Sequence, residues 1–264
     1  MSGDTLFVKI KSRLGLIVPP NGETELNIGV EEGPDYVLSE DFVGRFPQRE
    51  VIAEQFTSPE DIEVENYFEI LTREYGSLCA KITEKLTLDK ILVSVGGAHS
   101  VAFARIASIL RLHDPQKTGI VMIDSHGDIH QPSTSPTGNF HGMWLRPFVD
   151  KFEVPSSDKL VPENVPPKNL IYIGNLDLEM EEQGFLGENS VQVFNKEQIS
   201  QDKNLDKLKE SMDDKKHIHL SIDVDAFDHS YAPATGMRIE NGLAPREVFK
   251  VLDVFKQSHS ISVD

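Results

Sequence analysis

Four short apolar runs in this sequence end at a glycine or an acidic residue, and helical patterns lie between them. The runs lie in "KILVSVGG", "TGIVMID", "KNLIYIGN" and "HIHLSIDVD", which begin at residues 90, 118, 168 and 217. Strands that alternate with helices are typical of βαβ units and a parallel sheet. The sequence therefore predicts an α/β fold with a mostly parallel central sheet.

Apolar residues recur at helical spacing over about residues 63–86. Further helices are expected over about 99–113, 203–213 and 245–258, the last with Pro245 in its first turn. The loops that contain proline and serine are too short to indicate a domain boundary. With 264 residues, of which 39% are hydrophobic, the chain is expected to form a single domain over 1–264.

The charge of the chain excludes some classes of partner. The net charge of −17 repels nucleic acid and anionic membrane surfaces, so neither is expected as a partner. No run approaches the roughly 20 apolar residues of a membrane span, and the first residues show no cleavage site. A cytoplasmic protein is therefore expected. Cys79 is the only cysteine, which excludes an internal disulfide and a thiolate cluster, and it is expected to be buried in a helix.

Acidic and histidine residues gather at the ends of the predicted strands. Ligands of open parallel sheets bind at the carboxyl ends of the strands, where the loops converge. Extended backbone would point every second residue to the same side, so one short segment can present several ligands. Crowded carboxylates repel one another unless a cation compensates them. Each motif alone is also typical of a solvated loop or a helix cap, but together they predict a metal site made of His99, Asp124, His126, Asp128, Asp223 and Asp225.

The donor set of this site indicates the metal. Oxygen-rich ligation with two nitrogens and no sulfur favours manganese or magnesium over zinc or copper. Two divalent ions would balance four carboxylates, and we expect two Mn²⁺ per chain. Such a pair lowers the pKa of a shared water toward neutrality, which makes hydroxide available as a nucleophile. The expected reaction is hydrolysis.

Three of these segments point to a family. "GGAHS", "DSHGDIH" and "SIDVDAFD" resemble, in order and spacing, the metal-binding signatures of the ureohydrolases, the arginase and agmatinase superfamily. The resemblance extends from "GVEEGPDYVL" to the end of the chain, and "GVEEGP" and "TGNFHG" are more similar to arginase. It implies a three-layer α/β/α fold and hydrolysis of a small guanidino substrate. The implied reaction converts L-arginine to L-ornithine and urea with a hydroxide that bridges two Mn²⁺ ions.

The resemblance also implies individual roles. The six candidate ligands stand at the family's ligand positions, with Asp124, Asp128 and either Asp223 or Asp225 as bridging acids. His141 in "TGNFHG" matches the family's proton shuttle and is, with Asp128, the implied catalytic residue. An imidazole suits this task because its pKa lies near the working pH.

The loop before His141 resembles the arginase segment that holds the α-carboxylate and α-amino groups of the substrate. Its hydroxyl and amide groups suit carboxylate binding, although ordinary turn chemistry explains them equally well. Trp144, just after this loop, is expected to pack in the core. The implied substrate contacts are His130, Ser135, Thr137, Asn139, Glu179 and Thr235.

The sequence also departs from the arginase pattern. His130 stands where arginases commonly have asparagine, and Glu179 where they have aspartate. The sequence stops at Asp264, just before the position of the family's guanidinium-binding glutamate, so a fragment or an impaired site is expected. Two alternatives therefore stay open beside arginine hydrolysis. The substrate is agmatine, a guanidino acid or formiminoglutamate, or the chain is a catalytically silent metal-binding paralogue. Relatives commonly form trimers or hexamers, so a homo-oligomer is also implied.

Overall fold

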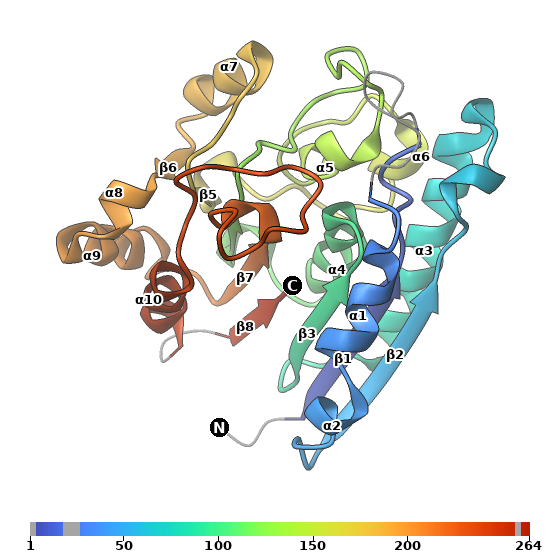
Figure 1. Ribbon diagram of the computed structural model, residues 1–264, viewed down its shortest axis with the longest axis horizontal. Coiled ribbons are helices and arrows are strands. Elements are labelled where there is room, and N and C mark those ends of the chain that lie inside the picture. The colour runs from blue at the N-terminus through green and yellow to red at the C-terminus, as the bar shows by residue number, and fades with distance from the viewer. Residues whose placement is uncertain (1–3, 18–26, 257–259) are drawn as a thin grey trace. The chain divides into compact units, whose positions relative to one another are not determined.

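The computed structural model describes residues 4–17, 27–256 and 260–264 of the chain. It divides into two compact units, and Figure 1 labels most of their helices and strands. The first unit is made of Met1–Leu112, Asp128–Asn164 and Asp264, and the second of His113–Gly127 and Val165–Val263. The boundary after Gly127 falls inside the sequence "DSHGD". The single catalytic domain expected over 1–264 stays a prediction.

Three parallel strands form the sheet of the first unit, in the order β2-β1-β3 (Figure 1). The strand β1 pairs with both of the others and is buried on both faces, as is usual in parallel sheets. Its buried apolar side chains are Leu6, Phe7, Val8 and Ile10. The three strands are β1 (Thr5–Lys11), β2 (Arg49–Gln55) and β3 (Ile91–Gly96).

Two helices that pack against each other cover part of this unit. The first, α3 (Tyr67–Lys85), confirms the helix expected over 63–86 and begins after a 3₁₀ turn at Val64–Asn66. The second, α4 (Ala102–Ile109), is shorter than the expected 99–113 at both ends: a 3₁₀ turn occupies His99–Val101, and the helix ends at Ile109. The remaining α-helices described in this unit are α1 (Gly33–Val37), α2 (Glu40–Val43), α5 (Arg146–Val149) and α6 (Pro155–Asp158).

Two expectations drawn from composition concern these helices. Cys79 lies on α3 with 2% of its surface exposed, which confirms its predicted burial. The Arg111 guanidinium donates a hydrogen bond to its sulfur at 2.9 Å.

Among the described residues of the whole chain, no helix has the length and apolar character that crossing a membrane requires.

Five parallel strands form the sheet of the second unit, in the order β8-β7-β4-β5-β6. All six residues of β4 are buried. Its last residue, Ile123, is paired with Ile173 of β5 on one side and Ile222 of β7 on the other, so three strands end together. The strands are β4 (Thr118–Ile123), β5 (Leu170–Ile173), β6 (Gln192–Phe194), β7 (His217–Ile222) and β8 (Ser260–Val263).

Helices of the second unit bury their apolar faces against this sheet. Leu208 of α9 and Val251 of α10 belong to one apolar cluster with Val121 of β4 and Leu220 of β7. Pro245 opens α10 as predicted, and residues 257 and 258 of that expected helix lie outside the described residues. The α-helices described here are α7 (Met180–Glu188), α8 (Lys196–Ile199), α9 (Asp202–Met212) and α10 (Pro245–Phe255).

The predicted α/β class with a parallel central sheet is confirmed. The first unit has three described strands and the second has five, and every pairing within each unit is parallel. The sequence did not predict β1, β2 or β6. Charged residues interrupt the apolar patterns of β1 and β2, and β6 has only three residues.

Candidate metal centre

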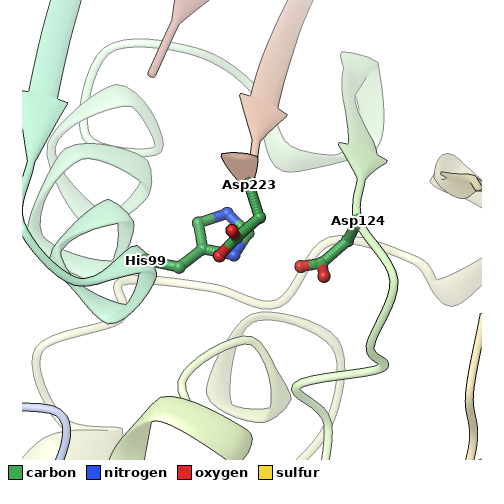
Figure 2. Close-up of side chains that lie close together, drawn as sticks. All are labelled: His99, Asp124 and Asp223. Atoms are coloured by element: carbon green, nitrogen blue, oxygen red, sulfur yellow. The ribbon is translucent and has the colours of Figure 1, made fainter. Parts of the chain in front are cut away.

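Two strands bring acidic side chains to the same edge of the second unit's sheet. Ile123 and Ile222 are paired in parallel at the ends of β4 and β7. Asp124 and Asp223 follow them directly, and Figure 2 shows both carboxylates beyond the strand ends. This confirms that acidic residues follow two neighbouring parallel strands. Figure 2 also labels His99 of the first unit, which follows β3.

Each of these acids closes a tight turn after its strand. Oδ1 of Asp124 accepts the backbone N–H of His126 at 2.8 Å, and Oδ1 of Asp223 accepts that of Asp225 at 2.9 Å. The prediction that extended backbone aligns residues 124–128 is therefore wrong. Asp128 even adopts the left-handed region, with φ of 52°. Aspartate side chains often bond to the backbone two residues on, and this turn presents the ligands in place of a strand.

Asp124, His126 and Asp225 form a compact group of candidate ligands. One ligand atom of each lies within 4.8 Å of the others. Nδ1 of His126 is 3.1 Å from Oδ2 of Asp225 and 3.6 Å from Oδ1 of Asp124. Asp124 is buried, whereas 29% of the His126 side chain is exposed. The group is therefore accessible to solvent at the imidazole.

The charges in this group shift two pKa values. Burial, followed by the negative charge of Asp223, raises the pKa of Asp225 to about 6. Burial lowers the pKa of His126, but hydrogen bonds to Asp124 and Asp225 outweigh it and raise this pKa to about 12. The carboxylates thus hold a positive charge between them. A donor set of carboxylates and one imidazole without sulfur fits a hard divalent ion.

The segment after β5 holds the ligand loop in place. Gly174 has φ of 152°, and a Cβ atom there would lie 2.0 Å from the carbonyl oxygen of Asp124. Only glycine tolerates both this conformation and this approach. Further along, the backbone N–H of Asp177 donates to the carbonyl of Ser125 at 2.8 Å. The segment after β5 therefore fixes the backbone of Asp124 and Ser125.

Two buried side chains enclose Gly127 in the same loop. The phenol of Tyr172, which is fully buried in β5, donates a hydrogen bond to the Gly127 carbonyl. Glu182 of α7 also lies against Gly127: a Cβ atom built on Gly127 would be 2.5 Å from Oε1 of Glu182. Its Oε2 accepts the backbone N–H of Glu179 at 3.2 Å. The sequence reasoning missed both side chains, although a tyrosine inside an aliphatic strand signals a hydrogen-bonding role.

The first unit holds a second group of candidate residues. Oδ2 of Asp128 accepts the indole N–H of Trp144 at 2.7 Å and lies 3.4 Å from Nδ1 of His99. The rings of His99 and Trp144 meet edge to face at 4.9 Å. Trp144 is fully buried, which confirms its predicted core position. Its bond to a candidate ligand was not predicted, although buried indole N–H groups usually find a partner.

His141 lies in a 3₁₀ turn of the first unit. Its backbone N–H donates to the carbonyl of Gly15 at 2.9 Å. The buried Tyr67 hydroxyl accepts the backbone N–H of Phe140 and donates to the Leu14 carbonyl at 2.9 Å. These bonds fix the backbone around His141. Its role as proton shuttle stays a prediction.

The predicted substrate loop is held by its own polar side chains. Ser135 accepts the backbone N–H of Gly138 at 3.1 Å, and Thr137 accepts that of Asn139 at 3.3 Å. The side chain of Asn139 is buried and accepts the backbone N–H of Ile17 at 2.9 Å. The contacts of Ser135 and Thr137 are turn chemistry, whereas Asn139 ties the loop to a segment distant in the sequence. Substrate binding by the three side chains stays a prediction.

The other predicted substrate contacts lie on separate segments. His130 is buried, and its Nδ1 is 3.0 Å from the Thr134 hydroxyl. Glu179 is exposed at the start of α7, and the Thr235 hydroxyl donates to the carbonyl of Met237. Within the first unit, His130 thus belongs to the same loop as Ser135, whereas Glu179 and Thr235 belong to the second unit.

The fold and the ligand group define an α/β protein with a candidate metal centre at the carboxyl edge of a parallel sheet. The sequence matches the Arginase family over residues 15–264. The chain therefore belongs to the arginase family. This confirms the predicted ureohydrolase superfamily and its arginase branch.

Individual relatives agree with this assignment. The chain is 29% identical to an arginase of Staphylococcus aureus (strain COL), with 94% of this chain and 87% of that protein covered. It is also 29% identical to Arginase-1 of Homo sapiens, with 90% and 79% covered. The structure of Entamoeba histolytica arginase in complex with L-ornithine matches with a TM-score of 0.84 at 22% identity, covering 100% of this chain and 91% of that one. The arginase-like fold is therefore confirmed.

Proposed function

We propose that this protein is a metal-dependent hydrolase that converts L-arginine to L-ornithine and urea. The group of Asp124, His126 and Asp225 at the strand ends carries the proposal, because it offers hard-ion ligands in a chain of the arginase family. Relatives named arginases from a bacterium and from human support arginine as the substrate.

The proposed site holds two Mn²⁺ ions. Bound divalent ions supply a water of lowered pKa, and so a nucleophile near neutral pH. The turns of Asp124 and Asp223 support the ligand assignment in the second unit, since each turn also positions the next ligand along the chain. The sequence signatures support the assignment of the ligands from the first unit. The full proposed set is His99, Asp124, His126, Asp128, Asp223 and Asp225.

The side chains of the protein bind the substrate and supply a proton. Hydrolysis breaks the bond between the guanidinium carbon and its substituted nitrogen, adds the oxygen of water to the carbon, and gives the leaving amine a proton. We assign the delivery of this proton to His141, with Asp128 as the second catalytic residue. The proposed substrate contacts are His130, Ser135, Thr137, Asn139, Glu179 and Thr235.

A related substrate is a second candidate, and one observation favours it. His130 is buried against the Thr134 hydroxyl, so a rigid imidazole lies at the start of the proposed substrate loop. This changes the bulk and the hydrogen-bonding groups that meet the end of the substrate remote from the guanidinium. Agmatine, a guanidino acid or formiminoglutamate would then replace arginine.

The test compares these substrates on protein reconstituted with Mn²⁺. Urea release is measured from L-arginine, agmatine and guanidino acids, and formamide release from formiminoglutamate. Faster turnover of arginine supports the main proposal, and faster turnover of another compound supports the second candidate. Tight Mn²⁺ binding without any turnover would support the silent paralogue.

Two variants control this test. Asp124→Asn keeps the size of a proposed ligand but removes its charge, and it is expected to abolish both tight Mn²⁺ binding and turnover. Asp206→Asn makes the same change on the exposed face of α9 and is expected to alter neither. The cytoplasmic location and the homo-oligomer stay predictions.

A further inference from the structure

Ser125 connects the two loops that carry the candidate ligands of the second unit. It lies between Asp124 and His126 after β4, and only 1% of it is exposed. Its hydroxyl donates to Oδ1 of Asp225, after β7, at 2.7 Å. The same hydroxyl oxygen is 3.1 Å from Nδ1 of His126. One buried hydroxyl thus contacts two candidate ligands from two strands.

This contact makes the two oxygens of Asp225 different. Oδ1 accepts the serine hydroxyl, whereas Oδ2 is 3.1 Å from Nδ1 of His126. A carboxylate that turned about its Cβ–Cγ bond would exchange these contacts. Since Asp225 is buried, solvent replaces a lost hydrogen bond there poorly.

We propose that Ser125 is a positioning residue that sets the orientation of the Asp225 carboxylate and so strengthens the binding of a divalent ion by the candidate ligand group. The inference rests on the proposed function, because it assumes that Asp225 binds a divalent ion. Hydrogen-bond partners of metal ligands orient them, and their loss typically weakens metal binding by about 10- to 100-fold. Ser125 acts through Asp225 and does not bind the metal itself.

The backbone of the loop does not depend on this hydroxyl. The Ser125 carbonyl accepts the N–H of Asp177, the Asp124 N–H donates to the carbonyl of Ile173, and the His126 N–H donates to Asp124. These bonds remain when the hydroxyl is removed. Ser125→Ala therefore changes the partner of Asp225 and leaves the path of the chain intact.

The experiment measures Mn²⁺ affinity by titration of the full chain, with free Mn²⁺ followed by electron paramagnetic resonance. Ser125→Ala is compared with Ser108→Ala, which removes another fully buried hydroxyl that donates to a backbone carbonyl, that of Ala104 on α4. Both changes are repeated in an Asp225→Ala background, where no carboxylate is left to orient. The free energy of unfolding without metal is measured for every variant.

The inference predicts that Ser125→Ala weakens Mn²⁺ binding by about 10- to 100-fold, that Ser108→Ala leaves it unchanged, and that Ser125→Ala has no further effect in the Asp225→Ala background. An equal loss in both backgrounds would show that the hydroxyl acts independently of Asp225, which overturns the inference. If Ser125→Ala still binds Mn²⁺ tightly, the inference about Ser125 is overturned, whereas the proposed function is not. If the unaltered protein does not bind Mn²⁺, the proposed function fails as well.

Discussion

The hydroxyl of Tyr172, in the middle of β5, donates a hydrogen bond to the carbonyl of Gly127, between two candidate metal ligands. Tyr172 is fully buried, and Glu182 encloses the same glycine. The loop that presents His126 is therefore anchored to the neighbouring strand as well as to the end of its own. Two predictions concern how this loop is held in place, and a third concerns a buried salt bridge of the first unit.

Tyr172→Phe removes the hydroxyl and little else. A buried carbonyl that loses its donor costs about 1–3 kcal/mol, so the free energy of unfolding is expected to fall by this amount. Denaturant unfolding without metal measures the loss. Because a ligand that binds only the folded state raises stability, excess Mn²⁺ is expected to recover part of it. Unchanged unfolding of the metal-free variant would show that the bond contributes nothing.

Gly174→Ala is expected to be strongly destabilising. The new Cβ would lie 2.0 Å from the Asp124 carbonyl oxygen, and the residue has φ of 152°, so the backbone must move. Gly184 within α7 is the matched control, since no atom lies within 4 Å of its Cβ position. Gly184→Ala is expected to raise the free energy of unfolding by about 0.5–1 kcal/mol through helix propensity. Equal effects of the two changes would contradict this account of the loop.

Arg105 and Asp264 form a salt bridge in which each side chain is 2% exposed. Asp264→Asn leaves the guanidinium buried without its charged partner, which typically costs about 3–5 kcal/mol. Asp41→Asn removes the α2 partner of the exposed Asp41–Arg45 salt bridge and is expected to leave the free energy of unfolding nearly unchanged. Thermal unfolding of both variants measures the difference, and similar midpoints would contradict the importance of the buried pair.

The sequence located two of the candidate ligands because their carboxylates follow long apolar runs. Such runs identify buried strands, and parallel strands end at one edge of a sheet, so Asp124 and Asp223 could be placed there. The turns that these acids close could not be predicted from the spacing of the polar residues. The same every-second-residue spacing occurs in a strand and in a turn where an aspartate bonds to the backbone two residues on. The roles of Tyr172 and Trp144 also stayed hidden, because they depend on contacts distant in sequence.

Stability is predicted to depend on pH through His113 and His217, whose ring centroids lie 4.1 Å apart in the second unit. Burial lowers the pKa of His113, and burial followed by the neighbouring histidines lowers that of His217 well below its usual value. The unfolded chain takes up protons near pH 6.5, whereas the folded chain takes them up only at lower pH. Their contribution is therefore fully present above that pH and declines below it.

The comparison of His113→Phe with the unaltered protein tests this dependence. Phenylalanine keeps a ring over His217 but does not titrate, so the loss of stability between pH 7.5 and pH 5.5 is expected to be smaller. Asp225 has the opposite effect on stability. Its pKa is raised to about 6 in the folded state, so its contribution to stability is lost as the pH rises. This contribution is the same in both proteins and cancels in the comparison. The same pH profile in both proteins would contradict the prediction.

Urea release from L-arginine by the full chain, measured after removal of metal and again after addition of Mn²⁺, tests the central claim most directly. The account predicts no release from the metal-free protein, release after Mn²⁺ is added, and none from Asp124→Asn under the same conditions. Release that is equal with and without Mn²⁺, or that persists in Asp124→Asn, would contradict the claim that this ligand group makes the protein a metal-dependent hydrolase.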